Sequence, residues 1–386
     1  MTDLLNPLRS LKEGHWFKLI CGASYQHLPA VRSLTLAYTL AGADCIDVAA
    51  DPAVIAAAKD GLQAASGLTR VAQQRDFGWS GSLPLLMVSL NDGEDPHFRK
   101  AEFNPTQCPD DCSRPCERIC PAQAITFNSR KNEFSGIISQ KCYGCGRCIP
   151  VCPYNIIYTK SYVSTPGAIA PLILSSGVDA IEIHTSIGRL AEFQRLWHSI
   201  LPWVERLKLV AISCPDGNGM IDYLHALHNV ITPLPCALIW QTDGRPMSGD
   251  IGDGTTLAAV KLGQKVLAAK LPGYVQLAGG TNNYTVAKLK AMGLLKKAGG
   301  PEVTGGAWGG AYSSPASLAS PASSSIAGVA YGSYARVLLS PILEQLEARE
   351  VKNARFKTTV RLEEEPELLW QAVSLAYSLV SQLKSQ

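Results

Sequence analysis

The sequence predicts an α/β fold: a (β/α)8, TIM-like barrel that is interrupted after its third strand by a small cysteine-rich insert. Eight short apolar runs alternate with stretches of helical periodicity, which is the count for a barrel of eight parallel strands. The alternation stops over residues 93–160, where eight of the chain's twelve cysteines lie. A doubly wound open sheet also alternates but usually has five or six strands, so we favour the barrel.

The predicted strands are apolar runs, rich in Ile, Leu and Val, that end at glycine or polar residues. The first runs from Phe17 to Cys21, and the second follows Gly42 and carries Ile46 and Val48. The third precedes the cysteine-rich segment, and five more follow it. In chain order the eight predicted strands are 17–21, 44–49, 83–90, 180–184, 208–213, 237–240, 274–278 and 326–330.

The predicted helices follow the strands and carry their own start and stop signals. The helix over 28–41 closes at Gly42, since glycine commonly ends a helix. Asp51 before Pro52 combines a capping side chain with a proline at the first helical position. Leu190, Phe193 and Trp197 recur at helical spacing after the fourth strand. Further helices are predicted over 167–175, 220–230, 255–269, 284–297, 334–350 and 364–383.

These elements divide the 386-residue chain into a large barrel and a small insert, a size that suits one large domain with an inserted module. The stretch 305–325 is nearly all Gly, Ala, Ser and Pro, a composition that cannot bury a core, so we expect a flexible loop there. The predicted divisions are 1–92 for the first part of the barrel, 93–160 for the insert, 161–350 for the rest of the barrel, and 351–386 for a C-terminal helical segment.

The cysteines of the insert form two runs, each closed by Cys-Pro. The first run holds Cys108, Cys112, Cys116 and Cys120; the second holds Cys142, Cys145, Cys148 and Cys152. This pattern is typical of two-cluster ferredoxins, in which each run gives its last cysteine to the cluster of the other run. We therefore predict a ferredoxin-like insert with two [4Fe–4S] clusters. One cluster would be held by Cys108, Cys112, Cys116 and Cys152, and the other by Cys142, Cys145, Cys148 and Cys120.

Other uses of these cysteines fit the pattern less well. Zinc sites also use paired cysteines but rarely this spacing. Disulfides need an oxidising compartment, and no secretory signal is visible. The second run matches the ferredoxin spacing fully, whereas the first two gaps of the first run hold three residues instead of two. Short strands are expected at 124–127, 136–138 and 155–158, with isoleucines shielding the clusters. These are Ile119, Ile125, Ile138, Ile149 and Ile156.

Composition narrows the remaining possibilities. The net charge is only +3 and the sequence contains no block of basic residues, so we expect no nucleic-acid partner. No apolar run approaches the length of a transmembrane helix. Oxygen-sensitive clusters and free thiols favour the cytoplasm. The four cysteines outside the insert lie in apolar contexts and are expected in the core; they are Cys21, Cys45, Cys214 and Cys236.

The ends of the last two strands suggest a second site. Glycines there can expose backbone N–H groups, and a helix N-terminus adds its dipole, so Gly279, Gly280, Gly332 and Ser333 are candidate ligands for the phosphate of FMN or another phospho-ligand. The alternative is that these glycines only permit tight turns. Other strand-end residues could supply acid–base groups, although no pair has a diagnostic spacing. These are Lys18, Asp47, Asn91, His184, Asp216, Gln241 and Asp243.

Three further stretches carry a family resemblance: GHWFKLICGAS at 14–24, AGADCIDVAADP at 41–52 and GVAYGSYAR at 328–336. Together with the cysteine runs they make the chain resemble the light-dependent period protein (LdpA) family of cyanobacteria. The resemblance implies an iron–sulfur redox sensor in the input pathway of the circadian clock, with clock proteins and histidine kinases as partners. The eight cysteines match the family's cluster ligands, and the resemblance supplies no catalytic residue.

Three functions remain open at this point. A redox sensor needs a solvent-accessible cluster and a neighbour that changes with it. A barrel oxidoreductase, the alternative, would pass electrons from the clusters to a flavin or a bound substrate. A plain electron carrier would not need so large a barrel. A quinone or another redox carrier is a conceivable partner, but no residue identifies it, and whether the chain is an enzyme stays undecided.

Overall fold

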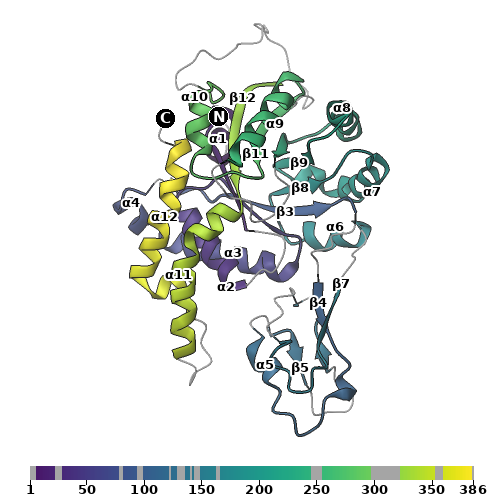
Figure 1. Ribbon diagram of the computed structural model, residues 1–386, viewed down its shortest axis with the longest axis vertical. Helices are drawn as coiled ribbons and strands as arrows, with labels where there is room; N and C mark the ends of the chain where they lie inside the picture. Colours follow the sequence, from purple (N-terminus) through teal and green to yellow (C-terminus); the bar gives the residue numbers. More distant parts are fainter. Residues whose placement is uncertain are drawn as a thin grey trace.

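The computed structural model describes residues 6–21, 28–77, 81–93, 99–120, 123–127, 135–139, 141–142, 148–161, 166–244, 254–296, 322–352 and 360–384. Eight parallel strands close into a barrel in the spatial order β1-β12-β11-β10-β9-β8-β3-β2 (Figure 1). The predicted fold class is confirmed. The barrel strands are β1 (Trp16–Ile20), β2 (Cys45–Ala49), β3 (Leu85–Asn91), β8 (Ala180–His184), β9 (Leu209–Pro215), β10 (Ala237–Asp243), β11 (Gly273–Ala278) and β12 (Ala322–Tyr331).

Helices surround the barrel and follow the predicted order. Asp51 caps α3 as predicted, since its Oδ1 accepts a hydrogen bond from the N–H of Ala53 at 2.8 Å. Pro202 ends α7 early, and the chain continues as a 3-10 helix over Leu201–Arg206. The helices are α1 (Asn6–Glu13), α2 (Leu28–Leu40), α3 (Pro52–Gly67), α4 (Thr69–Gln74), α6 (Pro166–Leu174), α7 (Leu190–Ile200), α8 (Met220–Ile231), α9 (Thr256–Ala268), α10 (Thr285–Ala291), α11 (Ser333–Lys352) and α12 (Pro366–Lys384).

The insert forms a separate lobe between β3 and α6 (Figure 1). Its two ends pair as antiparallel strands, β4 (Arg99–Glu102) with β7 (Tyr158–Ser161), and this ribbon joins the lobe to the barrel. A second pair, β5 (Ile125–Thr126) with β6 (Gly136–Ile137), lies within the lobe beside the short helix α5 (Pro115–Ile119). The predicted strand at 155–158 begins three residues later than expected.

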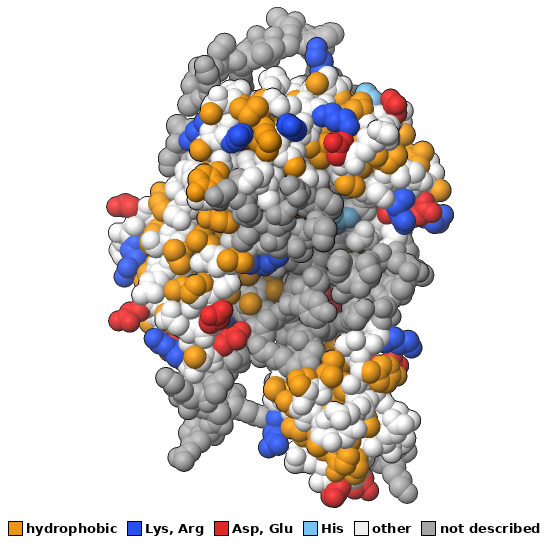
Figure 2. Space-filling view, in the orientation of Figure 1, with side chains coloured by type: hydrophobic (Ala, Val, Ile, Leu, Met, Phe, Trp, Pro, Cys, Tyr) orange, Lys and Arg blue, Asp and Glu red, His pale blue; other side chains and the backbone are white. Residues whose placement is uncertain are grey.

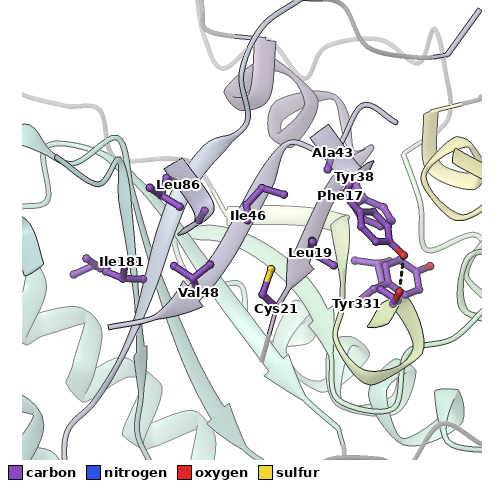
Figure 3. Packing of buried hydrophobic residues seen from close by; sticks show 14 of the residues in the cluster. Phe17, Leu19, Cys21, Tyr38, Ala43, Ile46, Val48, Leu86, Ile181 and Tyr331 are labelled. Atoms are coloured by element: carbon purple, nitrogen blue, oxygen red, sulfur yellow. Dashed lines mark hydrogen bonds between the residues drawn. The ribbon is translucent and has the colours of Figure 1, made fainter. Parts of the chain in front are cut away.

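The main core lies between the outer face of the barrel and the helices. Phe17 of β1 stacks on Tyr331 of β12 and on Tyr38 of α2, with ring centroids 5.1 and 5.9 Å apart. Figure 3 shows these rings together with Leu19, also on β1, and Ile46 of the neighbouring strand β2. All five side chains are fully buried. Alternate residues of each strand therefore attach the barrel to its helices, while the residues between them face the barrel interior.

The interior of the barrel is apolar at the end where the strands begin. Trp16, Met87 and Ile239 lie there, and Leu11 of α1 packs against this cluster. Helix α1 was not predicted from the sequence. The four cysteines outside the insert are all buried in the core, as expected; they are Cys21, Cys45, Cys214 and Cys236.

Two elements near the C-terminal half differ from expectation. Strand β12 starts at Ala322, so residues 322–325 belong to a strand and not to the predicted loop, while 305–321 lie outside the described residues. Serine-rich sequence gives no apolar signal, yet pairing with β11 holds these residues extended. Helix α10 ends at Ala291 because Gly293, at φ +65°, turns the chain away. Within the described residues no helix is both long and apolar enough to cross a membrane.

One glycine in the barrel is required by the close approach of two strands. A Cβ on Gly328 of β12 would lie 2.1 Å from the carbonyl oxygen of Trp16. We expect Gly328→Ala to lower the free energy of unfolding by about 3 kcal/mol or more, because a backbone cannot give way as a side chain can. Urea unfolding followed by tryptophan fluorescence measures this. Gly67→Ala is the matched control: no atom lies within 4 Å of its added Cβ, and its stability should be unchanged or higher. A stable Gly328→Ala barrel would contradict the packing.

Candidate metal centre

Four thiols from two distant segments lie close together in the insert. Cys108 is within hydrogen-bond reach of Cys112, and Cys116 is near enough to Cys112 and Cys152 for their charges to interact. Pro115, with its fixed φ, starts α5 and sets the position of Cys116. Cys116 and Cys152 are buried, whereas Cys108 and Cys112 are half-buried. These are the four residues predicted to share one cluster.

The thiols of the other predicted set lie mainly in the apolar core of the insert. Cys142 and Cys148 are buried there with Ile125 and Ile157, and Cys120 packs against the same core. Cys145 lies outside the described residues. Of the isoleucines expected to shield the clusters, Ile119 has 38% of its surface exposed, whereas Ile125 is buried.

Backbone N–H groups point at several of the sulfur atoms. The N–H of Ala101 donates to Cys142 Sγ at 3.4 Å, that of Ala124 to Cys120 Sγ at 3.2 Å, and that of Arg114 to Cys112 Sγ at 3.4 Å. Such donors stabilise negative charge on thiolates and on the sulfides that thiolates hold. Arg114 adopts φ +51°, a left-handed conformation that is uncommon for a residue with a side chain.

The donor set of these two groups fits an iron–sulfur cluster. Among the described cysteines all are free thiols, and no cluster of three or more potential ligands in the described segments is tight enough for a single metal ion. A cubane needs thiolates spread around a larger body, one for each iron. Burial and the adjacent Cys112 thiol raise the pKa of Cys108 to about 11, and burial raises the pKa of Cys116. Bound iron would reverse this, because a coordinating thiol is deprotonated.

A cation lies beside the first group. The guanidinium of Arg114 stacks 4.4 Å from the ring centre of Phe127, and its buried Nε has no hydrogen-bond partner among the described residues. Its charge favours the thiolate form of Cys108, since it acts to lower the pKa of that thiol. The same charge would favour an electron added to a cluster held there.

We expect Arg114→Gln to make that cluster harder to reduce. Its reduction potential should fall by on the order of 50 mV, close to a tenfold change for a one-electron couple, because a neighbouring positive charge is lost. Potentiometric titration followed by EPR measures the potential. Arg118→Gln is the control: Arg118 lies on α5, which Arg114 directly precedes, but it is exposed, so solvent screens its charge. An unchanged potential in Arg114→Gln, or an equal fall in both variants, would contradict this assignment.

Lys100 connects the cysteine loops with the barrel. Its Nζ donates to the carbonyl oxygen of Ser139 at 2.6 Å and lies 3.3 Å from Oδ2 of Asp51. Asp51 follows β2 and caps α3, while Ser139 precedes Cys142 by three residues. The next residue of β4, Ala101, donates to Cys142. We therefore expect a shift of the backbone at Cys142 to change the contact between Lys100 and Asp51 at the start of α3.

The four candidate phosphate ligands lie at the adjacent ends of β11 and β12. Gly279 and Gly280 adopt φ of +63° and +85°, and the carbonyl oxygen of Gly280 accepts a hydrogen bond from Thr255 Oγ1 at 2.7 Å. Gly332 precedes α11, which starts at Ser333. Arg336 Nη2 donates to Ser333 Oγ at 3.1 Å. Gly279 and Gly280 thus form tight turns, as the alternative interpretation expects. The guanidinium of Arg336 lies beside the start of α11.

The polar residues expected at the strand ends separate into two groups. Lys18, Asp47, His184 and Gln241 come together inside the barrel through ion pairs and hydrogen bonds. The other group does not join them. Asn91 is exposed, Asp243 is half-buried, and Asp216 pairs with Lys265 at 2.5 Å on the surface.

Sequence reasoning missed three members of the inner group: Glu182, Gln276 and Trp16. Glu182 is fully buried between Ile181 and Ile183. A charged residue in the middle of an apolar strand was the signal that could have revealed it. Gln276 within β11 gave a similar, weaker signal.

Comparison with known proteins supports the iron–sulfur assignment. The model of the LdpA Fe-S cluster-binding domain matches residues 108–163, and that of the light dependent period A C-terminal domain matches 172–382. The chain is 47% identical over 378 residues to "Light dependent period A" of Synechococcus elongatus, covering 98% of this chain and 94% of that protein. It is also 37% identical over 54 residues to "Putative oxidoreductase UacF" of Escherichia coli, covering 14% of this chain and 8% of that protein.

Solved structures give a more distant likeness. The tryptophan synthase alpha chain from Legionella pneumophila superposes with a TM-score of 0.40 at 11% identity, covering 99% of this chain and 98% of that one. A Mycobacterium tuberculosis tryptophan synthase gives a TM-score of 0.39 at 12% identity, covering 98% and 96%. Neither likeness supports a statement about function.

The closed barrel, the thiol groups and the matched cluster-binding domain define the class: an iron–sulfur protein built on a (β/α)8 barrel. Within that class the chain belongs to the light dependent period A family, as shown by both family models and by the full-length relative.

Proposed function

We propose that the protein carries two [4Fe–4S] clusters and senses cellular redox state for the input pathway of the circadian clock, passing the signal to clock proteins and histidine kinases. The observation that carries the proposal is that Cys116 and Cys152, residues from different runs, are buried in the same cluster of the insert. Bound clusters would supply one-electron redox chemistry. Membership of the light dependent period A family supports the place in the clock pathway.

The residues of the insert suit a sensor. Cys108 and Cys112 are half-buried, so a cluster held there would lie close to solvent and to redox carriers. Large apolar side chains are exposed on this lobe, with 45% of Tyr154 and 54% of Tyr158 accessible. Figure 2 shows hydrophobic side chains gathered on the insert. Such a surface can receive a partner, whether a signalling protein, a quinone or another redox carrier. The cytoplasmic location expected from free thiols belongs to the same proposal.

Composition and redox dependence are tested in two steps. Anaerobically purified protein should be brown and hold about eight irons and as much sulfide per chain. Pull-downs of clock proteins and histidine kinases from oxidised and from reduced extracts should then differ. Colourless protein, or one that holds zinc, would rule out the clusters. Identical partner capture in both states would leave the clusters in place but remove the sensing role.

The Lys100 bridge provides a test of signal transfer that needs no partner. We expect hydrogen exchange at the start of α3 to differ between oxidised and reduced protein, because Lys100 joins Asp51 to the loop before Cys142. In Lys100→Met this redox difference should disappear. Lys160→Met is the matched control. Lys160 lies opposite Lys100 in the register of the β4–β7 ribbon, but its side chain is exposed and its Nζ lies 3.5 Å from Oε2 of Glu102. Equal behaviour of the two variants would argue against the bridge.

A second candidate function is binding of FMN or another phospho-ligand at the mouth of the barrel, for an oxidoreductase fed by the clusters. The observation in its favour is Arg336, which lies beside Ser333 at the start of α11; burial lowers the pKa of Arg336, and no carboxylate among the described residues pairs with it. Denaturation of the purified protein should release a yellow compound if FMN is bound. Absence of any flavin would eliminate the flavoenzyme.

A further inference from the structure

The upper part of the barrel interior is polar and buried. Lys18, Asp47, Glu182, Gln241 and Gln276 are each at most 3% exposed. They form a layer above the apolar cluster around Trp16, toward the ends of the strands. Barrel interiors are filled mainly with branched apolar residues, and functional residues lie at the carboxyl ends of the strands. This polar layer therefore occupies the position of an active site.

Stability alone does not explain the layer. Removing ions from water costs several kcal/mol each, and apolar residues of similar volume are often as stable or more so. Here one ammonium and two carboxylates are buried together: Lys18 Nζ lies 2.8 Å from Asp47 Oδ2 and also donates to Glu182. Perturbed, buried ionisable groups of this kind gather at functional sites.

A chain of hydrogen bonds runs from the barrel floor to Glu182. The indole N–H of Trp16 donates to Gln276 Oε1 at 2.6 Å, and Gln276 Nε2 donates to Gln241 Oε1 at 2.6 Å. Gln241 Nε2 donates to Glu182 Oε1 at 2.5 Å. The same Oε1 lies 3.1 Å from Nε2 of His184, an ion-pair distance that continues the line to the mouth. Four hydrogen-bonded side chains from four strands thus lead to the imidazole.

The direction of every bond in this chain is fixed at its lower end. An indole N–H can only donate, so Gln276 must present its oxygen to Trp16 and its NH2 group to Gln241. Lys18, which also can only donate, lies 3.0 Å from Gln241 Oε1 and fixes the same orientation independently. Gln241 therefore gives its NH2 group to Glu182, and the Glu182 carboxylate accepts. Burial raises the pKa of Glu182, but the charges of Lys18 and His184 outweigh burial, so the pKa is lowered. A lowered pKa agrees with an ionised acceptor.

This direction determines the tautomer of His184. An ionised carboxylate has no proton to give, so the close approach of Glu182 Oε1 to Nε2 of His184 favours the proton on Nε2 of the imidazole. In the neutral ring Nδ1 then carries a lone pair. Of the side chains in this hydrogen-bond chain, only that of His184 reaches solvent, with 38% of its surface exposed.

Among the residues that the structure describes, the surroundings of His184 leave it as the acid–base group of this part of the mouth. Its register neighbours are Asn91 on β3 and Ser213 on β9, neither of which carries a charge. The nearby carboxylate of Asp92 accepts hydrogen bonds from Nε of Arg189 at 2.8 Å and from Oγ1 of Thr185 at 2.5 Å. Glu182 is the charged partner that the structure shows for the imidazole.

We propose that the barrel mouth is an acid–base site in which Nδ1 of His184 accepts a proton from an acidic hydroxyl group on a bound small molecule, with Glu182 as the positioning residue that fixes the tautomer of the ring. In this step the O–H bond of the ligand breaks and an N–H bond forms at Nδ1. Both electrons of the O–H bond stay on the ligand oxygen, and Glu182 stabilises the resulting imidazolium. The proposal does not depend on the clusters or on redox sensing.

The tautomer is tested by nitrogen NMR of the histidine rings in the full-length protein, with His184→Asn identifying the signal. The expected result is the Nε2–H tautomer. Glu182→Gln replaces the ionised acceptor with a neutral amide that can also donate, and the Nε2–H tautomer should no longer be favoured. Trp240→Phe is the control, because the indole of Trp240, buried in the barrel, donates to the carbonyl oxygen of Pro272 and not to the network. An Nδ1–H tautomer in the native protein, or no difference between Glu182→Gln and Trp240→Phe, would overturn the proposal.

Proton transfer is tested with p-nitrophenol, whose absorbance shows whether its hydroxyl group has lost the proton. Added at a pH where the free probe is mainly protonated, the native protein and Trp240→Phe should increase the phenolate band. His184→Asn should lose this increase completely, and Glu182→Gln should lose part of it. If the native protein leaves the absorbance unchanged, or if His184→Asn matches it, the site does not take such a ligand and the proposal fails.

Discussion

Replacing Cys152 with serine is expected to remove one whole cluster, and the cluster lost should be the one assembled on the other cysteine run. Cys152 ends the second run in the sequence, yet its thiol interacts with that of Cys116 in the first. If each run gives its last sulfur to the other cluster, iron should fall from about eight to about four atoms per chain in the single variant. Iron and sulfide analysis of anaerobic protein measures this.

Double variants distinguish exchanged from local ligation, because both models lose one cluster in the single variant. If the ligands are exchanged between runs, Cys116→Ser and Cys152→Ser both remove ligands of the same cluster, so the double variant should keep about four irons. Cys148→Ser combined with Cys152→Ser strikes both clusters and should leave none. Local ligation predicts the reverse pair of results. Cys214→Ser is the control, since Cys214 is a buried core residue of β9 and should leave the iron content unchanged.

The barrel could be predicted from the sequence because its signal is local. Each strand is an apolar run buried on both faces, and turn residues and caps such as Asp51 mark the helices. The β4 strand was missed for a physical reason: Arg99–Glu102 is charged and becomes a strand only by pairing with β7, more than fifty residues later. Pairing between distant segments leaves no periodic signal in either one.

The candidate sites divide in the same way. Cysteine spacing is a local pattern, so candidate metal ligands and a grouping for them could be proposed from the sequence, and the structure buries Cys116 and Cys152 of different runs in one cluster. The polar layer of the barrel is assembled from single residues on separate strands. These residues can be recognised as a group only when the strands are placed side by side in the barrel. Lys18, His184 and Gln241 were therefore seen as isolated candidates, while Trp16 and Gln276 were not seen at all. No spacing rule connects Trp16 with Gln276, although their side chains share a hydrogen bond.

Lys18 is where the largest effect on stability is expected. It is fully buried, and its ammonium contacts Asp47, Glu182 and Gln241. Removing one partner of a buried ion pair leaves an uncompensated charge and costs about 3–5 kcal/mol. We expect Lys18→Met to lose about this much at neutral pH, a large share of the stability of an ordinary domain. Lys265→Met, which breaks the exposed pair with Asp216, should lose less than about 1 kcal/mol.

The pH dependence separates this charge effect from a simple packing defect. In the native protein burial already raises the pKa of Asp47 to about 6, while the Lys18 charge opposes that rise. A carboxyl group whose pKa is higher in the folded than in the unfolded state binds more protons when folded, so stability falls as pH rises between the two values. Without Lys18 the pKa of Asp47 should rise further, and the pKa of Glu182 should rise from its lowered value. The loss of stability in Lys18→Met should therefore be greatest at pH 8 and shrink toward pH 5, as urea unfolding across this range would show.

A second substitution keeps the test decisive if Lys18→Met folds poorly. Combining it with Glu182→Gln removes one of the two unpaired carboxylates, and the double variant should recover part of the lost stability and most of its pH dependence, because less buried charge remains uncompensated. A packing defect would instead give a loss that is the same at every pH and that Glu182→Gln makes worse. The buried lysine is thus expected to act through its charge: it keeps Glu182 ionised in the barrel interior, and an ionised Glu182 is what holds the imidazole of His184 in position at the mouth.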